Sequence, residues 1–483
     1  MPFWPSVQEL SRFVARISES AYTTAVEALA YVNQSAPTFK RTRCLAMSRA
    51  YGADRALGPQ RLRRRRRVTD HTVKATMSIT LASRASNREP PRPSALHTLR
   101  ESWNIVDYIS LVSGRGQGLR IMHPQTNMRF KDIDLTSIER LRDVENYWAE
   151  KCLLFESHGY ALRPRYRPGW TPSWRGKPIF EILNAEDALS LHARVNVIDA
   201  RRISDGKLVY LKKIRPDSEE LKLLQRLSSP EMLEDPHNHC VPLMDVIYDP
   251  TDTETCFVVM PFLKYIDYPP FELVEDVLEC GEQILEGLVF LHDNNVAHRD
   301  CAHKNIMMDA TAMYPRGFHP MREMSLPDIS GLAPVLHRID VPVKYYFIDF
   351  GISTQFAPDQ HPRLVLGLEG LDKDVPELSA TVPYDPFKTD IFIIGSLLRE
   401  QFLERYSNTE ELGPLVRRMR NQDPDRRPSA HEALRDWKAM RRQIHGIKRY
   451  WRLRPPSHKE PWLLTLFFEF KASIIAILRY WGS

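Results

Sequence analysis

Apolar positions between residues 188 and 440 first follow the spacing of strands and then that of helices. Short apolar runs at Val195–Ala200 and Lys207–Lys212 flank Ser204-Asp205-Gly206, which has the composition of a hairpin turn. Later apolar residues recur every three or four positions, as on one face of a helix. The helices predicted in this way cover Glu272–Asn294, Asp390–Tyr406 and Glu411–Arg420. Strands followed by helices predict an α+β fold with a small sheet-rich lobe and a larger helical lobe.

The first 100 residues differ from this pattern and form a basic N-terminal region. They hold 18 Lys/Arg against 6 Asp/Glu, whereas the whole chain of 483 residues has a formal net charge of only +6. One amphipathic helix is predicted near Ser11–Tyr31, and the arginine run Arg61–Arg67 follows it. Dense like charges repel and bury little, so a poorly ordered, solvated tail is favoured. The alternative is a nuclear-import or nucleic-acid-binding arm.

Residues 101–187 are predicted to form an N-terminal extension of the lobed region. Leu141, Val144 and Trp148 indicate a short helix that ends near Lys151. The segment Gly159–Trp170 is rich in Arg, Tyr and Pro, so we expect it to run extended over a folded surface, with its aromatic side chains packed and its arginines outward.

Residues 441–483 are predicted to be a C-terminal tail with an apolar helix. The apolar segment Trp462–Tyr480 is interrupted by Glu469 and Lys471, and its uncharged runs are too short to span a bilayer. A helix packed on the main domain is favoured, and peripheral contact with a membrane is the alternative.

Cysteine usage indicates the cellular setting. The six cysteines are scattered without a C-x-x-C pair, which argues against a disulfide framework or a zinc cluster. With no secretory signal visible, the sequence predicts an intracellular protein, cytoplasmic or nuclear. No feature indicates an obligate oligomer.

Two motifs suggest the chemistry. His298-Arg299-Asp300 is followed, after four residues, by Asn305, and Asp349-Phe350-Gly351 follows an apolar run. In this order they match the H-R-D-x-x-x-x-N and D-F-G motifs. The chain therefore resembles protein kinases, and among them the kinase-like proteins of mushroom-forming fungi. The resemblance implies a two-lobed kinase-like fold, with ATP and Mg²⁺ as cofactors and a protein as substrate.

The resemblance also implies roles for the motif residues. Asp300 would accept the proton of the substrate hydroxyl. Asn305 and Asp349 would provide hard oxygen ligands to Mg²⁺.

A lysine and a glutamate complete the implied nucleotide site. Val209-Tyr210-Leu211-Lys212 resembles the V-A-I-K motif, so Lys212 is predicted to bind phosphates, with Lys213 as the alternative. Its predicted partner is Glu220 on the next helix, with Glu219 as the alternative.

Residues around Asp300 bear on the acceptor and on regulation. Ala302 stands where Ser/Thr kinases carry a lysine, and Lys304 is expected to reach the same phosphate; a Ser/Thr acceptor is favoured over Tyr. Arg299 usually binds a phosphorylated activation segment. Here Glu369, Asp372 and Asp374 stand in that segment, and we expect one of them to replace the phosphate.

Later motifs extend the resemblance over the region 188–440. Val375-Pro376-Glu377 resembles A-P-E, and Asp390–Gly395 resembles D-x-W-S-x-G. Arg427, in a stretch matching a late kinase segment, is predicted to pair with Glu377.

Two departures from the kinase pattern remain. No glycine occurs from residue 184 to 197, so the Gly-rich loop that covers the phosphates is missing. Asn305 and Asp349 are also far apart, so an insertion near Tyr314–Val341 is expected to protrude beside the active site, as a docking surface or a lid.

The sequence thus predicts a protein kinase whose activity the missing glycines put in question. One alternative is a weak or inactive pseudokinase that serves as an ATP-binding scaffold. A second is a small-molecule kinase, ranked lower because those enzymes generally lack the H-R-D arginine and the Glu377–Arg427 pair. A third is nucleic-acid binding through Arg61–Arg67.

Overall fold

The computed structural model describes residues 139–177, 182, 185–190, 196–444 and 446–456. The chain divides into two units, Met1–His97 and Thr98–Ser483, and every described residue belongs to the second. The predictions for Ser11–Tyr31, Arg61–Arg67 and Trp462–Tyr480 therefore fall outside the described residues.

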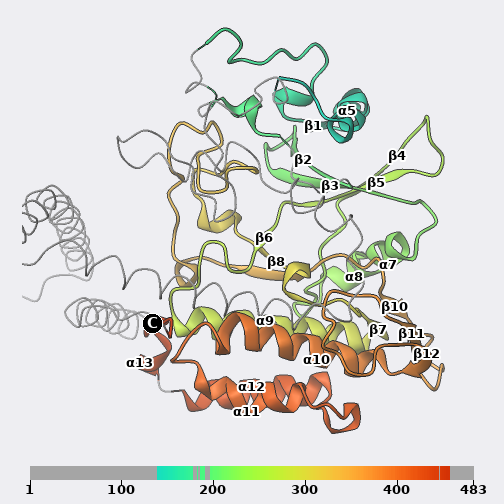
Figure 1. The fold of residues 1–483 in the computed structure, drawn as a ribbon, viewed down its shortest axis with the longest axis vertical. Coiled ribbons are helices and arrows are strands. Elements are labelled where there is room, and N and C mark those ends of the chain that lie inside the picture. Colours follow the sequence, from blue (N-terminus) through green and yellow to red (C-terminus); the bar gives the residue numbers. More distant parts are fainter. Residues whose placement is uncertain (1–138, 178–181, 183–184, 191–195, 445, 457–483) are drawn as a thin grey trace, which may run out of the picture. The chain divides into compact units, whose positions relative to one another are not determined.

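The small lobe is built on an antiparallel sheet with the strand order β1-β2-β3-β5-β4 (Figure 1). Its strands are β1 (Tyr160–Ala161), β2 (Val197–Arg202), β3 (Leu208–Ile214), β4 (Asp245–Tyr248) and β5 (Cys256–Pro261). The predicted hairpin is confirmed as β2–β3, and Gly206 in its turn has a φ of 71°, which suits glycine. Along β3, Val209 and Leu211 point to one face, so Tyr210 and Lys212 lie on the other.

Two short helices cover the outer face of this sheet. They are α5 (Asp143–Glu150), which confirms the helix predicted to end near Lys151, and α6 (Cys152–Ser157). Trp148 and Phe155 are fully buried there, and the Trp148 ring lies 5.7 Å from Phe257 of β5. These helices and β1 lie within residues 101–187, so the small lobe begins ahead of residue 188.

Of the three arginines expected to point outward in Gly159–Trp170, Arg167 is exposed and the other two are buried, which corrects the expectation for them. Arg163 and Arg165 are 8% and 1% exposed. Arg163 Nε lies 2.9 Å from Asp199 Oδ2 in β2, and Arg165 Nε lies 3.0 Å from Glu145 Oε1 in α5. Buried guanidinium groups need such carboxylates, so these pairs fasten the connection to the lobe.

The large lobe is mainly helical. Its helices are α9 (Val274–Asp293), α10 (Pro386–Leu398), α11 (Gly413–Met419), α12 (Ala430–Gln443) and α13 (Gly446–Arg449), and α10 continues as a π-helix at Arg399–Leu403. The predicted helix Glu272–Asn294 is confirmed as α9. Gly281 permits α9 to pack on α12, because a Cβ there would lie 2.2 Å from the Trp437 ring.

Smaller elements complete the lobes and border the cleft between them. The helices are α7 (Glu219–Leu227) and α8 (Pro230–Leu233), and the strands are β6 (Lys264–Tyr265), β7 (Val296–Ala297), β8 (Ile306–Asp309), β9 (Lys344–Phe347), β10 (Thr354–Gln355), β11 (Val365–Gly367) and β12 (Ser379–Tyr384). No helix within the described ranges is long and apolar enough to cross a membrane.

The insertion between β8 and β9 packs on the protein, which corrects the expectation that it protrudes. Met321 and Ile329 join a buried cluster with Trp174 and Leu189 of the β1–β2 connection. The buried Lys264 ammonium in β6 lies 3.0 Å from a Glu323 carboxylate oxygen. The insertion is therefore anchored to the β1–β2 connection and to β6.

Candidate active site

The catalytic-loop motif follows β7 and is held by one buried carboxylate. Asp390, at the centre of α10, is fully buried. It accepts hydrogen bonds from the backbone N–H groups of His298 and Arg299, at 2.8 and 2.7 Å. Arg299 has a φ of 67°, a strained value for a residue with a side chain. These charge-assisted bonds stabilise the turn that presents Asp300.

His298 links the catalytic loop to the D-F-G segment. Its Nδ1 accepts from the Asp300 N–H at 3.3 Å, so its Nε2 carries the hydrogen that is donated to the Ile348 carbonyl at 3.1 Å. The ring is buried, and burial lowers its pKa below the ordinary value of 6.5. His298 is therefore a neutral structural link.

Lys212, Glu220 and Asp349 come together in the cleft. Lys212 Nζ lies 2.6 Å from Glu220 Oε1 and 2.8 Å from Asp349 Oδ1. Of the paired alternatives, Lys213 instead lies over the Tyr147 ring and Glu219 bonds Lys222. The structure thus brings Lys212 and Glu220 to the site.

Lys212 and Asp349 each stabilise the charged form of the other. Burial opposes the charged form of Lys212, but Glu220 and Asp349 outweigh it and raise the pKa of Lys212. Burial likewise favours the neutral form of Asp349, yet Lys212 holds the pKa of Asp349 below its usual value. Asp349 also has a φ of 65°, a conformation that a functional site can retain at some cost.

Asp300 and Asn305 form a second pair at the floor of the cleft. The Asn305 amide nitrogen donates to the Asp300 backbone carbonyl and to Asp300 Oδ2, both at 2.8 Å. The other carboxylate oxygen, Oδ1, accepts from the Leu371 N–H at 2.6 Å. Burial raises the pKa of Asp300 above 3.8, although the Leu371 bond opposes the rise.

The activation segment lies directly on the catalytic loop. Arg299 Nη2 is 3.6 Å from Glu369 Oε2 and donates to the Leu366 carbonyl at 3.1 Å. Gly370, at a φ of 99°, permits this approach, because a Cβ there would lie 3.0 Å from the Arg299 carbonyl. Of the three acids expected near Arg299, Glu369 is the one that the structure brings to it; Asp374 lies 3.6 Å from Arg420.

The donor set suits Mg²⁺. Asn305 offers an amide oxygen and Asp349 a half-exposed carboxylate, the hard ligands that Mg²⁺ takes alongside phosphates and water. In the part of the chain that is described, no three His, Cys, Asp or Glu side chains gather as a protein-only metal cluster. Lys304 is exposed one turn beyond Asp300.

The predicted Glu377–Arg427 pair is confirmed as a support of the large lobe. Arg427 is 2% exposed and binds Glu377 through two parallel hydrogen bonds of 2.5 and 2.8 Å. The hydrogen bonds that Asp390 accepts from the catalytic loop, and the one that Asp300 accepts from the Leu371 N–H, could not be predicted from the sequence. Backbone donors leave no signal in a sequence.

The β1–β2 connection carries no Gly-rich loop motif. It runs from residue 162 to 196, and its two glycines, Gly169 and Gly176, do not form a G-x-G-x-x-G pattern. Where this connection is described, buried side chains fix it, as Arg163 and Arg165 show.

The two lobes and the residues gathered between them define a protein kinase-like α+β fold. No protein-family model matches the chain. Over 227 residues it is 26% identical to a probable casein kinase II subunit alpha homolog of Encephalitozoon cuniculi (strain GB-M1). Over 242 residues it is 27% identical to cyclin-dependent kinase 1 of the same organism. The matches cover 44% of this chain, and 58% and 73% of these relatives. These similarities support a protein kinase-like domain.

Proposed function

We propose that this protein is a protein kinase that transfers the terminal phosphoryl group of ATP to a hydroxyl of a protein substrate. The observation that carries the proposal is the position of Lys212 Nζ, 2.6 Å from Glu220 and 2.8 Å from Asp349. A lysine held between a helix carboxylate and the D-F-G carboxylate is poised to bind phosphates beside a metal. The similarity to two kinases supports the same function.

In this proposal Asp300 is the general base. The substrate hydroxyl oxygen forms a bond to the terminal phosphorus, the bond from that phosphorus to the bridging oxygen breaks, and the hydroxyl proton passes to Asp300. Asn305 orients the carboxylate through its bond to Oδ2. The Leu371 N–H has to release Oδ1, or share it, when the hydroxyl arrives.

Asn305 and Asp349 are the residues that would hold Mg²⁺, which supplies charge neutralisation to the phosphates. Lys212 would bind the non-transferred phosphates, and its raised pKa keeps it charged. Lys304 is exposed near Asp300, so its ammonium group is accessible to a phosphate, and we assign it to the transferred phosphate. Lys304 resembles the basic residue of tyrosine kinases, but no other feature of this region does. A Ser/Thr acceptor is therefore proposed over Tyr.

A pseudokinase scaffold is the second candidate. It is favoured by the missing Gly-rich loop and by the Leu371 contact with Asp300. The nucleic-acid alternative depends on Arg61–Arg67, and the membrane contact on Trp462–Tyr480. Both segments fall outside the described residues, and the relatives lend these two alternatives no support.

The test is Mg²⁺-dependent ATP turnover on a generic protein substrate, with Asp300→Ala beside the wild type. Loss of a general base lowers turnover by about 10²- to 10⁴-fold. Asp328→Ala is the matched control, because Asp328 is exposed and bonds within its own turn in the insertion. Turnover that survives in Asp300→Ala contradicts the proposed mechanism, and a wild type that never turns over favours the scaffold.

A further inference from the structure

Tyr210 lies beside Lys212 on the face of the sheet that borders the cleft. The two residues alternate with Val209 and Leu211, which are buried in the core on the opposite face. Positions two apart on a strand are separated by about 7 Å. The Tyr210 side chain thus leaves β3 two residues before the proposed phosphate-binding lysine. It lies on the side of that lysine that is nearer to Phe262, which connects β5 to β6.

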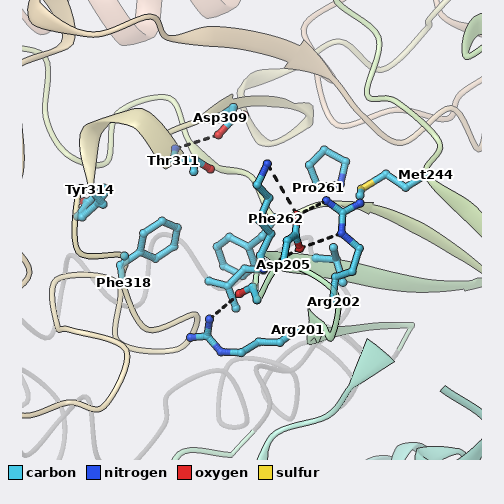
Figure 2. A pocket seen from close by; sticks show the side chains of 15 residues that line it. Arg201, Arg202, Asp205, Met244, Pro261, Phe262, Asp309, Thr311, Tyr314 and Phe318 are labelled. Atoms are coloured by element: carbon cyan, nitrogen blue, oxygen red, sulfur yellow. Dashed lines mark hydrogen bonds and ion pairs between the residues drawn. The ribbon is translucent and has the colours of Figure 1, made fainter. Parts of the chain in front are cut away.

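The Tyr210 ring is held in a stack of aromatic side chains. It is stacked on Phe262, with ring centres 4.4 Å apart and planes inclined by 19°. Phe262 is 4% exposed and lies 5.6 Å from Phe318 of the insertion. The ring centres of Phe318 and Tyr314 are 4.8 Å apart, and the Lys264 ammonium lies 4.3 Å from the centre of the Phe318 ring. Figure 2 shows Phe262, Tyr314 and Phe318 among the residues that line one pocket.

This stack fills the direction in which a nucleoside would extend from Lys212. With the phosphates at Lys212 and Asp349, the remainder of a nucleotide has to follow the sheet face one way or the other. Toward α7, Lys212 Nζ is paired with Glu220, 2.6 Å away. The other way leads over Tyr210 to Phe262. The V-A-I-K motif has alanine at the position of Tyr210, so this chain carries an aromatic ring where the motif has only a methyl group.

The open space near the stack is a cavity distinct from the Lys212–Asp349 pair. A cavity of about 390 Å³ is bordered by the β2–β3 hairpin, Pro261, Phe262 and the start of the insertion (Figure 2). Lys212 and Asp349 do not line this cavity. Phe262 lines this cavity, and the Tyr210 ring that is stacked on it belongs to a residue two positions before Lys212 in β3.

We propose that the Tyr210–Phe262 stack excludes the nucleobase, so that the cleft recognises the magnesium triphosphate end of its phosphoryl donor and not the base. The donor class is then any magnesium nucleoside triphosphate, or inorganic tripolyphosphate. This inference rests on the proposed function, since it assumes the phosphate site at Lys212, and it makes Tyr210 the residue that sets donor specificity.

The experiment compares the binding of MgATP, MgGTP, MgUTP and magnesium tripolyphosphate by calorimetry on the full chain. For the wild type we expect dissociation constants within about threefold of one another. Tyr210→Ala should bind MgATP at least tenfold more tightly than the wild type does, with no gain for tripolyphosphate. Tyr248→Ala, at an exposed tyrosine of β4, is the matched control, and Lys212→Met should lose all four ligands.

The outcomes separate this inference from the proposed function. A wild type that binds MgATP at least tenfold more tightly than tripolyphosphate overturns the inference and leaves phosphoryl transfer intact. A folded Tyr210→Ala without a gain for MgATP overturns it as well. Equal binding of all donors without turnover supports the inference and overturns the proposed transfer. If Tyr210→Ala does not fold, the wild-type comparison decides by itself.

Discussion

Replacement of Glu145 by Gln should weaken the attachment of the β1–β2 connection to α5. Glu145 in α5 is fully buried, and both of its carboxylate oxygens are within 3.3 Å of the Arg165 guanidinium. The Tyr166 hydroxyl also donates to Glu145, at 3.1 Å. Glu145→Gln keeps the shape of the side chain and removes the charge that is paired with the buried Arg165 guanidinium.

Two routes give the size of the effect. Burial works against ionisation, yet the bonds from Arg165 outweigh it and lower the pKa of Glu145 from 4.5 to about 2. At 1.36 kcal/mol per pKa unit, that shift corresponds to ~3 kcal/mol of folding free energy. Removing one partner of a buried pair typically costs about 3–5 kcal/mol. We therefore expect Glu145→Gln to lower the free energy of unfolding by ~3 kcal/mol at pH 7.

Urea unfolding followed by tryptophan fluorescence measures this free energy of unfolding. Trp148 of α5 reports on it, because it lies in one buried cluster with Tyr166, the residue next to Arg165. Because the pKa is lower in the folded state, the contribution is complete above pH 4.5 and is lost as the pH falls toward 2. The difference between wild type and variant should shrink over that range. Glu156→Gln, exposed on α6, is the control and should change stability by less than about 0.5 kcal/mol. If Glu145→Gln is as stable as this control, the buried pair does not hold the segment.

Three further outcomes are expected. Glu369→Gln should reduce turnover by up to about fivefold, because its exposed ion pair with Arg299 is worth at most ~1 kcal/mol; kinase assays beside Asp359→Asn, at an exposed site, test this. The pH–rate profile should have an acid limb above pH 3.8, since burial raises the pKa of Asp300 and the base must be ionised; a limb at or below 3.8 contradicts its role. Burial lowers the pKa of His239 from 6.5 to about 4, so between these values only the unfolded chain takes up the proton. Stability should therefore fall from pH 6.5 to 4, by up to ~3 kcal/mol, and His239→Gln should remove this dependence in urea titrations.

The sequence was sufficient wherever a local pattern determines structure. Alternation along Leu208–Ile214 and the three-to-four spacing in Val274–Asp293 depend on neighbours in the chain, so β3 and α9 could be predicted. The pairing of Arg427 with Glu377 could also be anticipated, because motifs at both positions were recognisable. Local periodicity and motifs thus led to the fold and to most of the candidate site.

Contacts that depend on the packing of distant segments could not be predicted. Arginines are usually exposed, and nothing near Arg163 indicates that Asp199, 36 residues later, would be buried against it. Tyr210 and Phe262 likewise meet only because β3 pairs with β5, a register that the sequence does not show. The departures from the kinase pattern therefore became interpretable only in three dimensions.

These departures have a common consequence under the proposed function. The missing Gly-rich loop and the Tyr210–Phe262 stack both change how tightly the donor is bound, and they do so equally in the ground state and in the transition state. Such uniform binding sets KM, whereas interactions that strengthen as the phosphoryl group moves set kcat. Under the proposed function, Asp300, Asp349 and Lys304 belong to the second kind, because they act on the hydroxyl, the metal and the transferred phosphate. A chain with this combination is expected to bind its donor weakly and still retain the groups that act on the transferred phosphate. A high KM by itself is therefore no sign of a pseudokinase, and kcat at saturating donor is the quantity that separates the two candidates.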